Sequence, residues 1–393
     1  MVSLLLIPLL SRPIQAPQPK EEFRGAWIAT VDNIDWPSHK GEPTSVARAE
    51  LQKIIDAAAN AHLNALLFQV RPMADALYKS PYEPWSEFLT GSQGLAPDED
   101  WDPLAYAVSE AHKKGIELHA WFNPFRAWHS VAKSAPSAKH VSIRHPEYVR
   151  QYGKQKWLDP GDPRAQDYTM KVMMDVVKRY DIDGVHIDDY FYPYPIKGTP
   201  FPDAASYKKW GNGMNKSAWR RANVDRFVAR MYREVHAAKP WLKVGISPFG
   251  IYRPNVPAGI KSSVDQYADL YADPKKWLQN GWCDYMTPQI YWGTDSDAQN
   301  FHKILDWWSE QNINGRYVWP GLAAYKMVEG PKWEPDEISA QIDAVRNEPG
   351  AAGEIFFSAK YIVRNTKGFA DVLSGEAYSS RAKVPSMPWL KRG

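Results

Sequence analysis

Short apolar runs alternate with longer segments of helical periodicity from residue 23 onward, and this alternation constrains the fold more than any other feature. Parallel strands need long crossover connections, so the alternation favours a parallel sheet covered by helices. The strand-like runs are Phe23–Thr30, Ala65–Val70, Glu117–Phe122, Gly184–Asp189, Lys243–Ser247, Tyr285–Tyr291, Tyr317–Leu322 and Glu354–Ser358. The seventh run is the poorest of them, because Pro320 breaks it. Eight β/α units over about 350 residues predict an α/β fold, a single-domain (β/α)8 TIM barrel.

The segments between these runs predict the helices and loops. Helices are expected at residues 45–62, 103–114, 163–180, 218–238, 264–280, 298–311, 335–346 and 366–373. Three long insertions, residues 71–101, 123–162 and 190–217, follow the second, third and fourth strands and should lie over the C-terminal face of the barrel. We expect the barrel domain to span residues 22–378, with a tail at residues 379–393.

Aromatic residues are frequent in this chain, whereas its charge is nearly balanced. The 48 Lys and Arg against 45 Asp and Glu leave a formal net charge of +3, which offers no electrostatic basis for binding nucleic acid. Many of the 18 Trp, 21 Tyr and 13 Phe fall in expected loops, as in Tyr190–Tyr194. Aromatic faces stack on the apolar faces of sugar rings, so these clusters predict a carbohydrate ligand; the alternative is that they fill a large core. The single Cys283 precedes an apolar strand and is expected to be buried and inert.

Residues 1–21 read as a signal-like segment followed by a spacer. The apolar run Val2–Leu10 is too short to cross a bilayer as a helix, and it resembles the hydrophobic region of a secretory signal peptide that ends near Ala16. A basic N-terminal region is absent, so an unstructured tail is the alternative. We expect export to the periplasm or cell envelope, with no transmembrane span.

The fourth strand carries the strongest candidate for chemistry. His186 and Asp188 alternate with Val185 and Ile187, so the first two should face the barrel lumen and the other two the surrounding helices. Asp188 then lies at the C-terminal end of a barrel strand, where barrel enzymes place their active sites, with Asp189 beside it. Two adjacent carboxylates repel each other, which raises a pKa unless a cation compensates. A loop cap or a salt bridge is the alternative role for the pair.

The other strand ends also carry polar or aromatic side chains that should converge at the same mouth. The expected substrate-binding residues are Arg71, Glu83, His119, Asn123, Arg126, His186, Tyr190, Gln289, Tyr291, Trp292, Tyr325 and Lys326. A metal site at His119, His186 and Asp188 is the alternative, but no H-x-H pair or thiolate accompanies them, so we expect hydrogen-bonding histidines and neither a metal nor another cofactor.

Several blocks of this sequence together resemble the bacterial glycosyl-hydrolase-like family 10, also called the DUF187 family. They are Phe23–Ser38, Gln69–Pro72, Asp75–Tyr78, Glu83–Ser86, His119–Pro124, Asp183–Pro195, Gly245–Gly250 and Pro288–Trp292, within residues 22–375. The resemblance implies a (β/α)8 barrel and an exported glycosidase. One member of that family, associated with the division machinery, hydrolyses peptidoglycan glycan strands that lack stem peptides. The resemblance thereby implies a peptidoglycan glycan substrate and cell-wall or division partners.

Glycoside hydrolysis generally needs two carboxyl groups, one to stabilise or attack the anomeric centre and one to protonate the leaving oxygen. We expect Asp188 in the first role, which also matches the strand-four nucleophile of barrels distantly related to the family. The second carboxyl is left open among Asp189, Asp75 and Glu83, with Asp295 behind them. A metal-dependent polysaccharide deacetylase and a non-catalytic glycan-binding barrel are the alternative functions.

Overall fold

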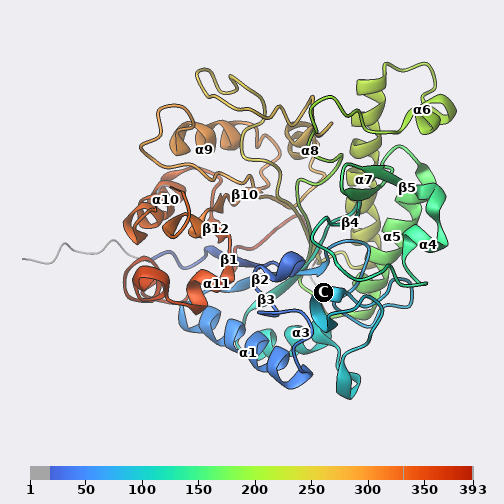
Figure 1. The fold of residues 1–393 in the computed structure, drawn as a ribbon. Helices are drawn as coiled ribbons and strands as arrows, with labels where there is room; N and C mark the ends of the chain where they lie inside the picture. Colours follow the sequence, from blue (N-terminus) through green and yellow to red (C-terminus); the bar gives the residue numbers. More distant parts are fainter. Residues whose placement is uncertain (1–17, 331, 392–393) are drawn as a thin grey trace, which may run out of the picture.

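A computed structural model describes residues 18–330 and 332–391 and confirms the predicted α/β barrel. A curled parallel sheet runs in the order β10-β9-β8-β7-β3-β2-β1-β12-β11, and helices surround it (Figure 1). Its strands are β1 (Phe23–Ile28), β2 (Ala65–Arg71), β3 (Glu117–Phe122), β7 (Gly184–Ile187), β8 (Lys243–Ile246), β9 (Tyr285–Met286), β10 (Tyr317–Val318), β11 (Gly321–Leu322) and β12 (Gly353–Phe356). Of the expected signal-like segment and spacer at residues 1–21, residues 1–17 lie outside the described part.

The expected sixth strand, Tyr285–Tyr291, is shorter than predicted and ends at Met286. The expected seventh strand forms two short strands, with the break at Pro320 as predicted. Pro320 has no N–H to donate, so the strand breaks there into β10 and β11. The intervening residues still bond to both neighbours: the Trp319 N–H donates to Met286 O at 2.9 Å, and the Ile355 N–H donates to Pro320 O at 3.0 Å. A further bridge joins Gln289 to Gly321. These bonds close the sheet into a barrel.

Asp-Pro pairs start three of the surrounding helices. Asp102, Asp162 and Asp273 each accept a backbone N–H of the first turn, and the proline that follows needs no hydrogen bond there. The helices that follow barrel strands are α1 (Thr44–Asn60), α3 (Pro103–Lys113), α5 (Pro163–Arg179), α7 (Lys216–Ala238), α8 (Pro274–Gln279), α9 (Phe301–Glu310), α10 (Pro335–Asn347), α11 (Ala359–Val363) and α12 (Phe369–Val372).

Two of the predicted helices were placed incorrectly. The helix expected at residues 264–280 is confined to α8, because its Asp-Pro start lies at residue 273 and residues 264–273 form turns. The helix expected at residues 366–373 is a 3₁₀ turn (Thr366–Gly368) followed by α12. Lys367 in that turn has a φ of 53°, which no α-helix accommodates.

The three insertions contain structure that the sequence did not predict. Residues 123–162 form a small antiparallel sheet of β4 (Arg126–Trp128), β6 (Gln155–Leu158) and β5 (Val149–Tyr152), with α4 (Val141–Arg144) between β4 and β5 along the chain. The other two insertions carry α2 (Glu87–Thr90) and α6 (Ala204–Trp210). Short 3₁₀ turns occupy residues 31–33, 98–100, 146–148 and 324–327, and a π turn residues 373–377.

The sheet separates two apolar cores, as strand alternation requires. Phe23 and Trp27 of β1 belong to the lumen core with Tyr285 and Trp319, whereas Ala26 packs in the core between the sheet and the helices. The rings of Phe23 and Trp319 stack with centroids 3.9 Å apart. The lumen is therefore filled with aromatic side chains below the C-terminal mouth.

The C-terminal segment packs against the lower end of this lumen core. Met387 is buried in it, and the Trp389 indole N–H donates to Asp284 at 2.8 Å, at the start of β9. The backbone of Lys383 forms an isolated parallel β-bridge with the backbone of Glu21. In residues 18–330 and 332–391, no helix has both the length and the apolar character needed to span a membrane.

Gly245 gives the first prediction, because a Cβ at this position of β8 would lie 1.9 Å from Cζ of the buried Tyr285 ring. Gly245→Ala should lower the free energy of unfolding by about 1–3 kcal/mol through overpacking, measured by urea denaturation. Gly375→Ala is the matched control, since nothing lies within 4 Å of the place its methyl group would take, and it should change stability by less than about 0.5 kcal/mol. Equal effects of the two substitutions would contradict this packing.

Candidate active site

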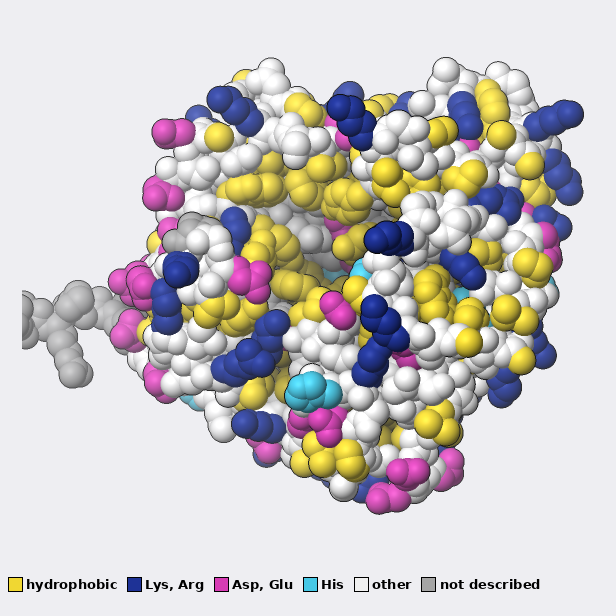
Figure 2. Space-filling model, in the orientation of Figure 1, with side chains coloured by type: hydrophobic (Ala, Val, Ile, Leu, Met, Phe, Trp, Pro, Cys, Tyr) yellow, Lys and Arg dark blue, Asp and Glu magenta, His cyan; other side chains and the backbone are white. Residues whose placement is uncertain are grey.

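A cavity of about 420 Å³ opens at the C-terminal face of the barrel, and Figure 2 shows the hollow with hydrophobic side chains along its walls. Its position at the carboxyl ends of the strands is the one that (β/α)8 barrels use for ligands. The lining residues are Trp27, Ala29, Val31, Ile34, Gln69, Trp121, Arg126, Asp188, Asp189, Tyr190, Tyr194, Ser247, Phe249, Gln289, Tyr291, Trp292, Tyr325, Lys326 and Phe357.

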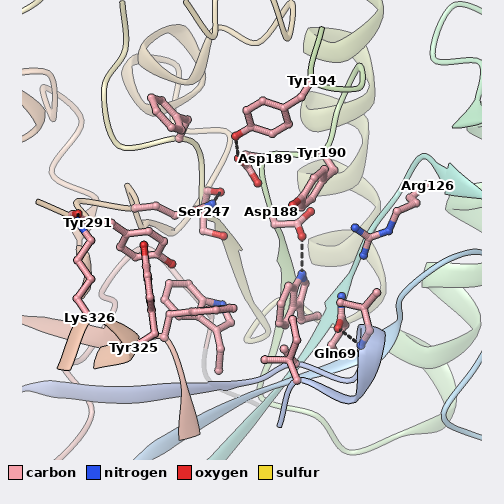
Figure 3. Close-up of a pocket in the computed structure, with 18 of the residues that line it drawn as sticks. Gln69, Arg126, Asp188, Asp189, Tyr190, Tyr194, Ser247, Tyr291, Tyr325 and Lys326 are labelled. Atoms are coloured by element: carbon pink, nitrogen blue, oxygen red, sulfur yellow. Dashed lines mark hydrogen bonds between the residues drawn. The ribbon is translucent and has the colours of Figure 1, made fainter. Parts of the chain in front are cut away.

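Asp188 follows β7 directly and is 3% exposed. Its Oδ2 accepts the Trp121 indole N–H at 3.1 Å and a short hydrogen bond from the Asn123 amide (Figure 3). Its Oδ1 is buried and has no hydrogen-bond partner among the described residues. One carboxylate oxygen is thus fixed from below, and the other is free for a bound ligand.

Asp189 lies beside Asp188 in the cavity wall and is 5% exposed. It accepts a short hydrogen bond from the Tyr194 hydroxyl. Burial, together with the neighbouring Asp189 charge, raises the pKa of Asp188 to about 7, while Arg126 opposes the shift. Burial also raises the pKa of Asp189, against the hydrogen bond from Tyr194. The two carboxyls titrate as a pair that can hold one proton near neutral pH.

A chain of oriented amides positions Asn123 against Asp188. The Gln69 side-chain oxygen accepts the backbone N–H groups of Thr30 at 2.8 Å and Val31 at 2.9 Å, so its amide nitrogen faces Asn123. The Asn123 oxygen accepts that amide at 2.6 Å and the Arg126 guanidinium at 2.7 Å. Only the Asn123 NH₂ group then remains for Asp188. The orientation of the Asp188 carboxylate therefore depends on backbone groups that follow β1, and Gln69 of β2 and Asn123 after β3 connect the two.

Two histidines and a tyrosine form a hydrogen-bonded column in the lumen below the cavity. The Trp27 indole can only donate, so His186 Nε2, 3.3 Å away, accepts, and its Nδ1 carries the proton. That Nδ1 lies 3.1 Å from the Tyr285 hydroxyl, which in turn lies 2.7 Å from His119 Nδ1. Burial lowers the pKa of His186 well below its usual value, so this ring is neutral. The column holds Trp27, part of the cavity floor, in place.

Aromatic side chains form the wall opposite the carboxyl pair (Figure 3). The Tyr291 ring packs edge to face with Tyr325 at 5.8 Å, and Trp292 does so with Phe249 at 5.6 Å. Lys326 donates a short hydrogen bond to the Tyr291 carbonyl. On the other side, the Arg126 guanidinium lies 4.8 Å above the Tyr190 ring. Sugar-sized aromatic faces therefore flank the acids on both sides.

The structure brings nine of the predicted site residues together in the cavity lining. They are Asp188, Asp189, Arg126, Tyr190, Gln289, Tyr291, Trp292, Tyr325 and Lys326. Asn123, His119 and His186 lie beneath the lining and support it through the bonds described above. Strand periodicity assigned His186 to the lumen correctly, but it could not place the two histidines in a layer below the cavity.

Arg71, Glu83 and Asp75 lie elsewhere. Arg71 and Glu83 form a fully buried two-bond ion pair, with Nη2 to Oε1 at 2.6 Å, which ties β2 to the loop after it. Asp75 is buried in the same loop, where its Oδ2 accepts the Gln93 amide at 3.4 Å, and burial raises its pKa to about 7. The exposed Asp295 is also outside the lining. Of the carboxyl candidates, the cavity holds Asp188 and Asp189.

The sequence reasoning did not select several residues that line the cavity, including Trp27, Trp121, Tyr194 and Phe357. Tyr194 lies in the aromatic run after β7, so the clustering of tyrosines was the signal available for it. Trp27 and Trp121 occupy lumen-facing positions of β1 and β3, which strand periodicity indicates. Periodicity does not show whether a lumen-facing ring lines the bottom of the cavity or is buried in the core below it.

The family model described as glycosyl hydrolase-like 10 matches residues 22–339 of this chain. The glycosyl hydrolase YngK of Bacillus subtilis is 43% identical over 394 residues, covering 97% of this chain and 77% of the relative. The glycosyl hydrolase DigH of Escherichia coli is 34% identical over 381 residues, covering 89% of this chain and 86% of the relative.

Solved structures of low sequence identity share the fold. The glycoside hydrolase domain of PgaB (BpsB) from Bordetella bronchiseptica superposes with a TM-score of 0.57 at 13% identity, covering 92% of this chain and all of that one. The catalytic domain of a Paenibacillus polymyxa β-amylase gives a TM-score of 0.56 at 12% identity, with the same coverage. At these identities the likeness shows the barrel architecture alone.

Tyr285→Phe tests the column below the cavity, because it removes the hydroxyl that both histidines contact. Two buried ring nitrogens lose a partner, so the free energy of unfolding should fall by about 2 kcal/mol in urea denaturation. Tyr317→Phe is the control: its hydroxyl donates to Ser386 O at 2.9 Å in an exposed setting, where water replaces the bond. If Tyr317→Phe lowers the free energy of unfolding by as much as Tyr285→Phe does, the hydrogen bonds of the column contribute nothing specific to stability.

Proposed function

Because the chain belongs to the glycosyl hydrolase-like 10 family, we propose that it hydrolyses glycosidic bonds of a bacterial polysaccharide, with the glycan strands of peptidoglycan as substrate. Two relatives that cover most of the chain are named glycosyl hydrolases. The barrel fold and a cavity at its C-terminal face support the same reaction class. The observation that carries the proposal is the buried Asp188–Asp189 pair between aromatic walls.

The pair supplies the two carboxyl groups that glycoside hydrolysis needs. Asp188 is the carboxylate that stabilises positive charge at the anomeric centre, since two N–H donors favour its ionised form and Oδ1 is free. Asp189 is the acid that protonates the leaving oxygen, since it is the other carboxyl of the cavity lining and its pKa is also raised. A proton shared by the pair gives the required ionisation state near neutral pH.

The walls of the cavity fit a polysaccharide rather than a small polar metabolite. Tyr190, Tyr291 and Trp292 offer faces for sugar rings, and Gln289 and Ser247 offer hydrogen-bonding groups at the strand ends. A chain of β-linked sugars presents alternating apolar faces and hydroxyl edges, which matches this combination. A ligand held by stacking on both sides of the acids is positioned for cleavage at the pair.

The donor set of the two histidines does not favour the metal-dependent deacetylase. His119 and His186 direct their Nδ1 atoms at the same Tyr285 hydroxyl. Their Nε2 atoms lie 3.1 Å from Glu117 and 3.0 Å from the Ser247 hydroxyl. Within residues 18–330 and 332–391, no group of three or more His, Cys, Asp or Glu side chains has metal-binding geometry.

A peptidoglycan substrate also has a consequence for the compartment in which the protein acts. Peptidoglycan lies outside the cytoplasmic membrane, so the proposal includes export to the periplasm or cell envelope and action beside other cell-wall or division proteins. The apolar run at residues 2–10 supports this part of the proposal.

Substitution of each acid by asparagine tests whether the protein cleaves glycan or only binds it. It also distinguishes the carboxylate that stabilises the anomeric centre from the acid that protonates the leaving oxygen. Asp188→Asn should lower kcat about 10³-fold or more on peptidoglycan glycan freed of peptides by an amidase, measured as release of reducing ends with products identified by mass spectrometry. Asp189→Asn should lose a comparable factor on the natural glycan. It should keep most activity on an aryl glycoside whose phenolate leaves without protonation, whereas Asp188→Asn should not.

Asp295→Asn is the matched control, because this exposed carboxylate lies outside the cavity lining and should leave kcat unchanged. Glycan that binds to the wild type without release of reducing ends would contradict the hydrolase proposal and leave the glycan-binding barrel. Metal-dependent release of acetate would support the deacetylase instead.

The pH dependence follows from the raised pKa of the pair. Activity needs one proton shared by the two carboxyls, so kcat/KM should pass through a maximum. It should fall on the acidic side as the pair takes up a second proton, and on the alkaline side, near pH 7, as the pair loses its last proton. An acid whose pKa is higher in the folded than in the unfolded state loses stabilising free energy as pH rises between the two values. Wild-type stability should therefore fall between about pH 4 and pH 7, relative to Asp188→Asn.

Both readouts are measured on the same two proteins. The pH–rate profile is recorded for the wild type, and urea unfolding at several pH values for the wild type and Asp188→Asn. An Asp188→Asn protein that tracks the wild type at every pH would rule out the raised pKa as the cause.

A further inference from the structure

Lys326 is a half-buried cation in the cavity wall without an acidic partner. It follows β11 in a 3₁₀ turn, lines the cavity, and forms no ion pair with any carboxylate of the described residues. Its ammonium donates to the Tyr291 carbonyl and lies 5.0 Å from the centre of the Trp333 ring. A carbonyl and an aromatic face orient the ammonium without neutralising it.

Some other lysines of this protein form ion pairs with carboxylates, whereas Lys239 donates to a backbone carbonyl, as Lys326 does, but lies outside the cavity lining. Lys40 pairs with Glu87 at 2.8 Å, and Lys243 pairs with Glu117 at 2.8 Å. Burial of a cation without such a partner costs free energy, and for Lys326 burial lowers the pKa with no acid acting against it. An anion bound beside Lys326 would remove that cost.

The anion that Lys326 lacks is not the catalytic pair. Arg126 is the cation that lowers the pKa of both Asp188 and Asp189. In Figure 3, Arg126 lies on one side of this pair, and Lys326 lies with Tyr291 and Tyr325 on the other side of the cavity. Each end of the site thus has its own cation, and only the Arg126 end has acids within the protein.

From this arrangement we infer that Lys326 binds a carboxylate carried by a sugar of the substrate, and so selects acidic glycans. This inference rests on the proposed function, since it names a feature of the glycan cleaved at the same site. The lactyl ether of a muramic acid residue carries such a group when no peptide is attached, and a uronic acid carries one on its ring. An amide in the same place has no charge, so a peptide-substituted muramic acid gains nothing from Lys326.

The test compares three substrates. The first is peptidoglycan glycan freed of peptides, with free lactyl carboxylates. The second is the same glycan after carbodiimide coupling to ammonia, which turns each carboxylate into a neutral amide. The third is an oligosaccharide of N-acetylglucosamine and glucuronic acid, which places the carboxylate on the ring. Wild-type kcat/KM should be about tenfold or more higher on the free than on the amidated strands, the size of one charge-assisted hydrogen bond.

Lys326→Met should lose this preference and Lys326→Arg should keep it. The Met variant should bring the ratio of kcat/KM between acidic and amidated glycan close to one, a loss of about tenfold in preference, while retained cleavage by Lys326→Arg shows that the fold and the acid pair tolerate a change at this position. Lys303→Met is the control, since this exposed lysine lies on α9 outside the cavity lining. High salt should shrink the wild-type preference.

The outcomes separate this inference from the proposed function. A Met variant that keeps the wild-type ratio between acidic and amidated strands overturns the role of Lys326, while cleavage itself upholds the hydrolase. Dependence on Lys326 for the uronic glycan alone assigns the carboxylate to the sugar ring. If the wild type cleaves none of the substrates, the proposed function fails, and calorimetric binding of acidic against amidated strands by wild type and Lys326→Met still decides the inference.

Discussion

The position of Asp188 depends on a chain of hydrogen bonds that crosses the mouth of the barrel. Backbone N–H groups just after β1 orient Gln69, Gln69 orients Asn123, and Asn123 donates to Asp188. Each amide has one arrangement that satisfies all of its neighbours, so residues from the ends of other strands orient the carboxylate. The closed parallel sheet is what brings these residues, which are far apart in sequence, within bonding distance.

The same site holds groups that lower the stability of the folded chain. Asp188 leaves a buried oxygen unpaired, Asp189 repels it, and Lys326 lacks an acid. A fold selected for stability alone would replace such groups with apolar ones. The column of His119, Tyr285 and His186 below them is, by contrast, hydrogen-bonded throughout. Among the buried side-chain atoms of the described residues that lack a hydrogen-bond partner, Asp188 Oδ1 is the one that belongs to the cavity lining. A buried carboxyl group in a cavity, with an unpaired oxygen and a raised pKa, is a feature expected of a binding and catalytic site.

Most of the barrel could be predicted from local periodicity, because a buried strand and an amphipathic helix leave repeating apolar patterns. The errors fell where a local pattern competes with a backbone constraint. The Asp273–Pro274 start shortens the helix expected from residue 264, whereas the break of the seventh strand at Pro320 could be predicted from the missing N–H of proline. For the site, alternation placed His186 and Asp188 in the lumen, and strand ends led to the residues around the mouth. It could not tell that Arg71 and Glu83 satisfy each other in the core.

By itself, the sequence determined the number and order of the barrel elements and the strand that presents the acid pair, because these depend on the period of apolar residues along a single segment. Only the tertiary structure decided which carboxyls share a cavity, which cations form ion pairs within the protein, and that the two histidines lie below the cavity lining. Those properties depend on distances between side chains from different strands. The charge state of each side chain then depends on its burial and on the ion pairs and hydrogen bonds that it forms. Asp75 and Asp189 are alike as residues, and it is the packing around each that separates a loop carboxyl from a cavity one.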